Sequence, residues 1–366
     1  MYAVDGSRLL FLFPFLVEYA MVRQTCFLFL FLMGTSLLPG CQRSGDDRQA
    51  VSDESQPTVG YVTNGIASFW VIADKGARDA ARDHNAQVEV RMPPSGVSDQ
   101  KRMVQDLIAR GIDGIAISPI DPDNQGDLLD EIARHTILIT HDSDAPESDR
   151  VCYVGMDNYV AGRMCGKLVK DAIPEGGSVV IFIGRLAQEN ARLRRQGLID
   201  ELLDRSEDPT RYDRPDVGEL KGEKYTILDT RTDDFDFPKA KAQAQEVITR
   251  FPDVDCMVGL FAYNPPLILE AVRDARKLDE IKIVAFDEHD ATLQAIIDGE
   301  IVGTIVQHPY RYGYESVRIL AGLARADKSV LPEDGFLNID ARRITPENVD
   351  EFWAELKQLT AEKPGK

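Results

Sequence analysis

Residues 58–92 read TVGYVTNGIASFWVIADKGARDAARDHNAQVEVRM. The apolar run Val59–Thr63 and the β-rich run Val88–Met92 are predicted to be strands. Between them, Phe69–His84 has apolar residues at helical spacing, with Ala, Arg and Asp on the outer face. Because strands that are joined through a helix lie parallel in one sheet, this stretch predicts an α/β fold.

The same alternation continues along the chain and restarts once. The first series is completed by a helix over 99–110 and strands over 112–118 and 137–140. The second series has strands over 178–183, 225–229, 256–259, 282–286 and 303–306, and helices over 189–205, 238–251, 265–277 and 291–298. The fold class that this order predicts is α/β, with two doubly wound parallel-sheet lobes. In TPENVDEFWAEL, Thr345 is expected to cap a terminal helix with Pro346 at its first position.

The N-terminal residues have the pattern of a secretory signal. Arg23 precedes the apolar run FLFLFLM (27–33), and the segment LPGC that ends at Cys41 resembles a bacterial lipobox. We expect residues 1–40 to be a signal peptide, with Met21 as an alternative start, and Cys41 to be lipidated. Residues 41–57 are polar and acidic, which suits a tether between a membrane and a domain. The alternative is an uncleaved N-terminal anchor helix.

Charge and cysteine content argue against several classes of function. Acidic residues outnumber basic ones by 61 to 42, and a net charge of −19 disfavours nucleic-acid binding. Cys152, Cys165 and Cys256 lack the spacing of a metal site. In an oxidising compartment a Cys152–Cys165 bridge is conceivable, but buried free thiols are the favoured interpretation.

Polar side chains follow most of the predicted strands, where ligands bind in parallel α/β sheets. These positions are Asn64, Ser118, His141, Asp142, Ser143, Arg185, Asp229, Asp287 and Gln307, while the aromatic Phe261 follows the strand over 256–259. Nearby in sequence are the aromatic residues Phe69, Trp70, Phe235 and Tyr263. Aromatic faces stack on the C–H faces of a sugar ring, and carboxylates, amides and guanidinium groups bind its hydroxyls. The residue types therefore indicate a sugar site.

Six segments, in order, resemble the periplasmic ribose/galactose-binding family of type I solute-binding proteins. They are TVGYVTNGIASFW (58–70), ILITHDSDAPESDRVCYVGMDNYVAGR (137–163), ENARLRRQG (189–197), DDFDFPKAKAQAQEVITRFPDV (233–254), IVAFDEHD (283–290) and GTIVQHP (303–309). The resemblance extends from about Thr58 to about Asp340. It implies two lobes joined by a three-strand hinge, which we expect near 156–157, 307–308 and 337–340. Residues 58–156 with 308–336 are then the N-lobe, and 157–307 with 337–366 the C-lobe.

The resemblance also implies roles for individual residues. Phe69 and Trp70 would form one stacking wall and Phe235 the other, and Arg192 would donate hydrogen bonds to the sugar. The remaining implied ligand contacts are Asn64, Asp142, Ser143, Phe261, Asn264, Asp287 and Gln307. Arg194 and Arg195 are expected on the solvated helix face. Ribose binders have Arg at the position of Ser143 and Asn at those of Ala67 and Phe261, so a deoxy sugar or a larger monosaccharide is expected rather than ribose.

Plainer interpretations exist for the same residues. Phe69 and Trp70 could be core residues at a helix start, the two aspartates could be turn residues, and Asn264 could cap a helix. His141, His289 and His308 lie beside predicted site positions, but their spacing does not favour a metal site. His141 should point away from the face that Asp142 uses, because side chains alternate along a strand.

The function that the resemblance implies is capture of a monosaccharide for an ABC permease. We expect a monomer outside the cytoplasm that touches the membrane only through its lipid, and that has no catalytic residues, cofactor, metal or nucleic-acid partner. One alternative is a receptor domain that presents the sugar to a sensor kinase or chemoreceptor. A glycosidase with paired Asp142 and Asp287 is less favoured. A transcriptional regulator would need a DNA-binding motif before Thr58, where the signal and tether lie instead.

Overall fold

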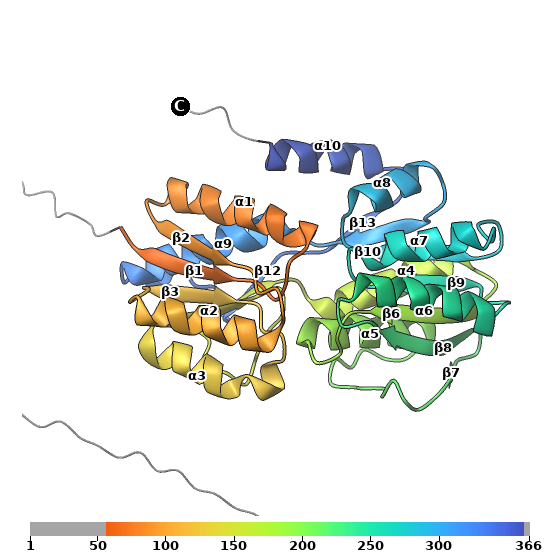
Figure 1. Cartoon of the computed structure of the whole chain (residues 1–366), viewed down its shortest axis with the longest axis horizontal. Coiled ribbons are helices and arrows are strands. Elements are labelled where there is room, and N and C mark those ends of the chain that lie inside the picture. The colour runs from red at the N-terminus through yellow and green to blue at the C-terminus, as the bar shows by residue number, and fades with distance from the viewer. Residues whose placement is uncertain (1–55, 362–366) are drawn as a thin grey trace, which may run out of the picture. The chain divides into compact units, whose positions relative to one another are not determined.

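The computed structural model describes residues 56–361, which fold into two α/β lobes (Figure 1). The predicted signal peptide, the alternative start at Met21 and the lipidation site Cys41 lie outside the described residues. In the part of the chain that is described, no helix is both long enough and apolar enough to cross a membrane.

The N-lobe is built on a six-stranded sheet in which every neighbouring pair is parallel. Its strand order is β12-β5-β4-β3-β1-β2. The strands are β1 (Thr58–Val62), β2 (Gln87–Arg91), β3 (Gly114–Ile117), β4 (Ile137–His141), β5 (Tyr153–Gly155) and β12 (Phe336–Asn338). The helices of this lobe are α1 (Ser68–Asp83), α2 (Val97–Ala109), α3 (Gly126–His135) and α9 (Pro309–Ala324), with 3-10 turns at Pro122–Asn124 and Lys328–Val330.

The C-lobe has a seven-stranded sheet in the order β13-β11-β10-β9-β6-β8-β7, in which only the edge strands β13 and β7 run antiparallel to their neighbours. The strands are β6 (Gly177–Ile183), β7 (Leu220–Lys221), β8 (Tyr225–Thr232), β9 (Cys256–Gly259), β10 (Lys282–Phe286), β11 (Gly303–Val306) and β13 (Arg342–Ile344). The helices are α4 (Asn158–Ala172), α5 (Glu189–Leu202), α6 (Phe237–Arg250), α7 (Asn264–Asp274), α8 (Asp290–Ile297) and α10 (Val349–Thr360).

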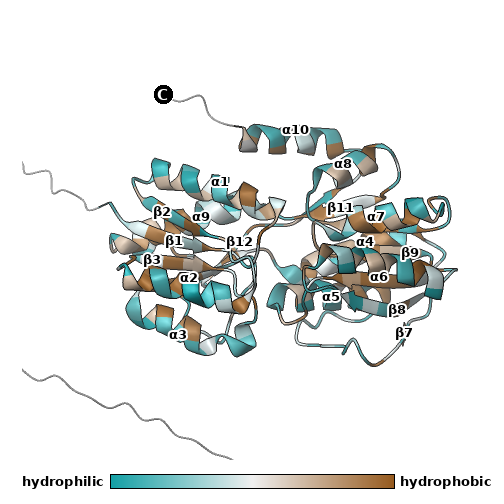
Figure 2. Ribbon diagram, viewed as in Figure 1, coloured by the Kyte–Doolittle hydropathy of each residue, from teal (hydrophilic) through white to brown (hydrophobic). Residues whose placement is uncertain are grey.

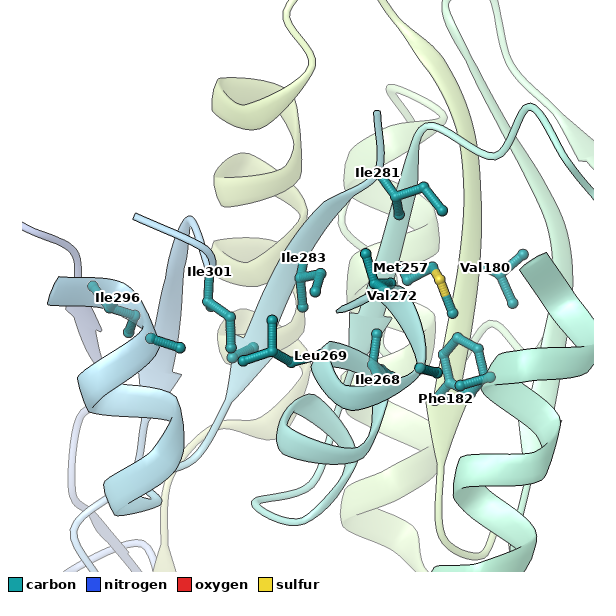
Figure 3. Packing of buried hydrophobic residues seen from close by; sticks show 14 of the residues in the cluster. Val180, Phe182, Met257, Ile268, Leu269, Val272, Ile281, Ile283, Ile296 and Ile301 are labelled. Atoms are coloured by element: carbon teal, nitrogen blue, oxygen red, sulfur yellow. The ribbon is translucent and has the colours of Figure 1, made fainter. Parts of the chain in front are cut away.

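Each sheet is covered on both faces by helices, which confirms the predicted doubly wound class. In the C-lobe, Val180 and Phe182 of β6 pack with α6 and α7 on one face (Figure 3). The alternate residues Val179, Ile181 and Ile183 pack with α4 and α5 on the other face. In the N-lobe, α1 and α9 cover one face and α2 and α3 the other. Figure 2 shows apolar strands under helices whose outer faces are polar.

The chain passes between the two sheets three times: between β5 and α4, between β11 and α9, and between β12 and β13. Because β12 pairs with β5 as far as Asn338, the N-lobe sheet continues beyond the predicted boundary at Phe336. The terminal helix also differs from its prediction. It begins at Val349 after Asn348, whose side-chain oxygen instead accepts a hydrogen bond from the backbone of Thr345 (2.8 Å), so Thr345 is not the cap.

Candidate functional site

A cavity of about 40 Å³ lies between the lobes at the carboxyl ends of the strands. The N-lobe contributes residues after β1 and β4, and the C-lobe contributes residues after β8, β9, β10 and β11. Its lining residues are Asn64, Ala67, Phe69, Trp70, Asp142, Arg194, Phe235, Phe261, Ala262, Tyr263, Asp287 and Gln307. Most of the residues predicted from the sequence are therefore brought together here. Ser143, Arg192 and Asn264 are not part of the lining.

Arg194 of α5 is the central charge of this cavity. Its side chain is fully buried, and its two terminal nitrogens lie 3.8 Å from Asp142 and 3.7 Å from Asp287. Its Nε donates a hydrogen bond to Asn158 (2.8 Å), which fixes the plane of the guanidinium group. One terminal nitrogen has no hydrogen-bond acceptor among the described residues. A cation that is oriented in this way can donate to a ligand oxygen without first breaking another hydrogen bond.

Close packing of two helices holds Arg194 in place. A Cβ atom added at Gly162 of α4 would lie 2.2 Å from the backbone oxygen of Arg194, and one added at Gly197 of α5 would lie 2.1 Å from that of Tyr159. Only glycine permits this approach of the two backbones. The short distance between α4 and α5 places the base of Arg194 beneath the cavity, so its side chain reaches both aspartates.

Asp142 and Asp287 lie directly after β4 and β10, and both have left-handed backbone conformations, with φ of 60° and 64°. Asp tolerates this conformation better than most residues, and it turns each carboxylate out of the sheet edge. Asp142 accepts hydrogen bonds from Asn64 (3.2 Å), Ser118 (3.0 Å) and Asn190 (3.1 Å). Asp287 accepts one from Gln307 (2.7 Å).

Burial dominates the electrostatics of the two carboxylates. It raises the pKa of Asp142 to about 6, with a further contribution from Asp287, while Arg194 and the donors from Ser118 and Asn190 act in the opposite direction. Burial also raises the pKa of Asp287, and Arg194 again opposes this. The single guanidinium group lowers the pKa of both carboxylates and so favours the charged form of each, which accepts hydrogen bonds.

Aromatic side chains form apolar walls on both lobes. In the N-lobe, Phe69 and Trp70 meet edge to face with their ring centroids 4.8 Å apart. In the C-lobe, Phe235 packs against Phe261 at 5.5 Å and against Tyr263 at 5.6 Å. Phe69 and Trp70 also belong to the buried core under α1. They are therefore both core residues and part of the cavity lining.

The three arginines lie elsewhere than expected, since Arg194 and Arg195 are buried and Arg192 does not line the cavity. Arg192 lies outside the cavity and forms an ion pair with Asp123 of the other lobe at 2.7 Å. Two residues advance a helix by roughly 200°, so Arg192 and Arg194 point to different sides of α5. Arg195 is not solvated either. It is 1% exposed, and it donates hydrogen bonds to Thr230 (2.9 Å) and to the backbone oxygen of Asp213, because the loop after α5 folds back over this face.

Ser143 and Asn264 are buried but do not line the cavity. The hydroxyl of Ser143 makes no hydrogen bond with the described residues, and its backbone N–H donates to His141 (2.6 Å). Asn264 donates to Asp233 (2.9 Å) and accepts from the backbone of Phe261 (3.2 Å). It therefore stabilises the loop that carries Phe261. It is the first residue of α7 and not its N-cap.

Sequence reasoning missed Arg194 and Asn190 as site residues. Asn190 belongs to the C-lobe, and its amide donates to Asp142 of the N-lobe, while its own side-chain oxygen is buried without a described donor. The spacing of Asn190 and Arg194 is the sequence signal that could have identified them, because residues four positions apart share one face of a helix. Tyr263, which was noted only as a nearby aromatic residue, lines the cavity and donates to Asp233.

No histidine or cysteine is among the residues that line this cavity. His141 stacks on Tyr61 with ring centroids 4.1 Å apart, and burial lowers its pKa to about 3. His289 and His308 accept backbone hydrogen bonds at the N-termini of α8 and α9. No group of three potential metal ligands occurs within the described residues. The cysteines of the described region, Cys152, Cys165 and Cys256, are free and buried.

A larger groove of about 960 Å³ also separates the lobes, near the loop after β4 and the start of α5. It contains Asp123, Glu189 and Arg192, but neither the two aspartates that flank Arg194 nor the aromatic walls. Because the smaller cavity combines apolar faces with buried, oriented polar groups, we place the candidate ligand site there.

Comparison with known proteins shows to which family the chain belongs. Residues 59–328 match the periplasmic binding protein domain. The chain is 26% identical over 264 residues to the ribose import binding protein RbsB of Salmonella typhimurium, covering 71% of this chain and 82% of the relative. A carbohydrate transporter solute-binding protein from Agrobacterium radiobacter, solved in complex with D-arabinose, is similar in fold with a TM-score of 0.73 and 21% identity, over 84% of this chain and 100% of the other. The structure titled XylFII-LytSN complex matches with a TM-score of 0.69 and 23% identity, over 80% and 98%. The chain belongs to the periplasmic binding protein domain family.

Proposed function

We propose that this chain binds a monosaccharide between its two lobes and delivers it to an ABC permease. The observation that carries the proposal is the position of Arg194, which is buried between Asp142 and Asp287 in a cavity with aromatic walls from both lobes. Vicinal hydroxyls can bridge a carboxylate and a guanidinium group, and the C–H faces of the ring can stack on the aromatic walls. The RbsB relative supports this ligand class by its name.

The site is suited to binding without chemical conversion. Asp142 and Asp287 both lie beside Arg194 and are engaged by amide donors from Asn64, Asn190 and Gln307. A glycosidase needs one carboxyl group that protonates the leaving group and a second that attacks or activates water. Asp142 and Asp287 share one guanidinium group and so have similar surroundings. Such a pair is better suited to binding sugar hydroxyls than to acting as one acid and one nucleophile or base.

The site residues in this proposal are those that line the cavity on both lobes. Asp142, Asp287, Arg194, Asn64 and Gln307 bind hydroxyls. The stacking surfaces are Phe69, Trp70, Phe235 and Phe261. Since contacts come from both lobes, the ligand favours the closed arrangement, which a permease can then recognise.

Membership of the family places the chain outside the cytoplasm, and we propose that an acyl group on Cys41 attaches it to the membrane. The signal-like run before Cys41 and the polar tether after it support this attachment. We further propose that the protein is a monomer.

A thermal-shift screen of the purified protein against a panel of neutral monosaccharides tests the proposed function. We expect at least one sugar to raise the unfolding temperature, because a ligand that binds only the folded state stabilises it by mass action. The Asp142→Asn variant, which should remain folded, should lose this response. If no sugar stabilised the parent protein, monosaccharide binding would be rejected.

A second candidate function is sugar sensing, which the likeness to the structure titled XylFII-LytSN complex favours. In that case the closed lobes would dock on a receptor and not on a permease. Pull-down of the sugar-bound protein with the detergent-solubilised membrane proteins of its own host, compared with the sugar-free protein, distinguishes the two. Recovery of permease subunits supports transport, and recovery of a sensor kinase supports sensing.

A further inference from the structure

The C-terminal helix α10 is fixed to the C-lobe by its first half. Val349 and Phe352 are buried in the same core as the strands and helices of that lobe. The indole N–H of Trp353 donates to Asp290 at the start of α8 (3.0 Å). Arg342 of β13 forms an ion pair with Glu355 (2.9 Å) and lies over the ring of Phe352. This half of α10 must therefore move together with the C-lobe.

The second half of α10 extends toward the N-lobe (Figure 1). Leu356 and Leu359 line a crevice of about 10 Å³ together with Ile72 of α1 and with Pro309 and Tyr310 at the start of α9. Both of these helices belong to the N-lobe. One helix thus bridges the two lobes across the hinge, and it lies outside residues 59–328, which match the family domain.

The same crevice is connected to the ligand cavity through Gln307. This hinge residue lines both spaces, and its amide donates to Asp287 of the proposed site (2.7 Å). Glu288, the neighbour of Asp287, is 2% exposed in the crevice, and neither of its carboxylate oxygens bonds to another described residue. Burial raises its pKa well above the ordinary value. Residues of α10 therefore line the same crevice as a buried acid next to the site.

We propose that α10 is an interlobe brace that stabilises the closed arrangement of the lobes. In this structure the lobes already touch at the site, where Asn190 of the C-lobe donates to Asp142 of the N-lobe (3.1 Å). Because α10 is fixed to the C-lobe, rotation of the lobes about the hinge changes the distance between Leu359 and Ile72. Leu359 and Ile72 line one crevice in this arrangement, and in the proposal their apolar surfaces become exposed to water when the lobes rotate apart.

The ligand-free protein tests this brace independently of what the protein binds. Spin labels on Lys101→Cys in α2 and Lys167→Cys in α4, both at exposed positions on different lobes, report the interlobe distance in the mature chain with Cys41→Ser. The native cysteines of the described region are buried. Leu359→Ala and Ile72→Ala should each broaden the distance distribution and move it away from the closed distance. The double variant should add little, because both changes remove the same contact.

Gln358→Ala is the matched control, since Gln358 is an exposed residue of the same helix. It should leave the distance distribution of the parent unchanged, and unfolding temperatures should show that all variants are folded. If a sugar ligand is found, its affinity for the variants provides a second measurement, and this measurement rests on the proposed function. The brace variants should then bind it about threefold to tenfold more weakly. Distance distributions that are identical in the parent and in Leu359→Ala would overturn the brace, whether or not a sugar binds.

Discussion

The guanidinium group of Arg194 lies 3.8 Å from the carboxylate of Asp142, and these two residues belong to different lobes. The contact places a cation of the C-lobe against an anion of the N-lobe inside a cavity that both lobes line. In the proposed function, ligand recognition and lobe closure therefore depend on the same pair of charges.

Replacement of Arg194 by Ala should impair both stability and binding. It leaves Asp142 and Asp287 buried without a counter-ion, and breaking such a pair typically costs about 3–5 kcal/mol of unfolding free energy. Sugar affinity should fall by more than tenfold, because hydrogen bonds to charged groups contribute roughly 1.5–3 kcal/mol each. Chemical denaturation and calorimetric titration measure the two effects. Arg192→Ala is the control and should bind normally, since Arg192 pairs with Asp123 in the outer groove.

Tryptophan fluorescence should report the ligand through a single residue. The chain has two Trp residues, Trp70 in the cavity wall and Trp353 in α10. A sugar that stacks beside Phe69 and Trp70 changes the surroundings of Trp70 only. We expect Trp70→Phe to abolish the change in emission while Trp353→Phe preserves it. The opposite pattern would place the ligand elsewhere.

Folding stability should fall as the pH rises from 6.5 to 8. Burial raises the pKa of Glu189 to about 8, and Asp144 of the other lobe adds to the effect. The unfolded chain releases this proton near the ordinary value of 4.5, so between these two values the folded state holds more protons and loses stability as the pH rises. Burial also raises the pKa of Glu288, so this residue likewise makes folding stability fall as the pH rises. Solvent in the groove screens part of the effect at Glu189.

Below pH 6.5 the histidines oppose this trend. Burial lowers the pKa of His141 to about 3 and that of His308 to about 4, so the unfolded state gains protons first as the pH falls. The informative range is therefore 6.5 to 8. Denaturant unfolding of the parent and of Glu189→Gln over this range should show a smaller slope for the variant. Equal slopes would exclude Glu189 as a source of the dependence.

The membrane anchor can be checked without a ligand. Cys41 follows a signal-like run, and we expect the mature chain to begin there with an acylated cysteine. Mass spectrometry of the membrane-extracted protein should find this N-terminal peptide, and Cys41→Ser should release the protein from the membrane fraction. An intact longer chain with an unmodified Cys41 would contradict the anchor.

The sequence was sufficient for the fold because its signals are local. Apolar strands such as Cys256–Gly259 and Lys282–Phe286 agree with the structure in both bounds, and helix ends differ by a few residues. The residues that follow strands, such as Asp142 and Asp287, were also found, since topology alone brings strand ends together. The antiparallel edge strands β7 and β13 were not foreseen because short edge pairs carry little periodicity.

The assignment along α5 failed for a physical reason. Its hydrophobic pattern is not amphipathic, because buried Arg194 and Arg195 occupy positions where a core helix usually has apolar side chains. Their burial depends on partners distant in sequence, which are Asp287 for Arg194 and the backbone of Asp213 for Arg195. No local pattern records such partners. A run of three arginines within four positions therefore resembled a solvated face.

Calorimetric titration of the sugar identified by the thermal-shift screen, into the parent protein and into Asp142→Asn, tests the central claim most directly. Asp142 accepts hydrogen bonds from three side chains, and the amide of the variant keeps its size while removing its charge. We predict one sugar per parent chain and binding that is about tenfold to a hundredfold weaker in the variant. Equal affinities for the parent and for Asp142→Asn would contradict a sugar site between the lobes.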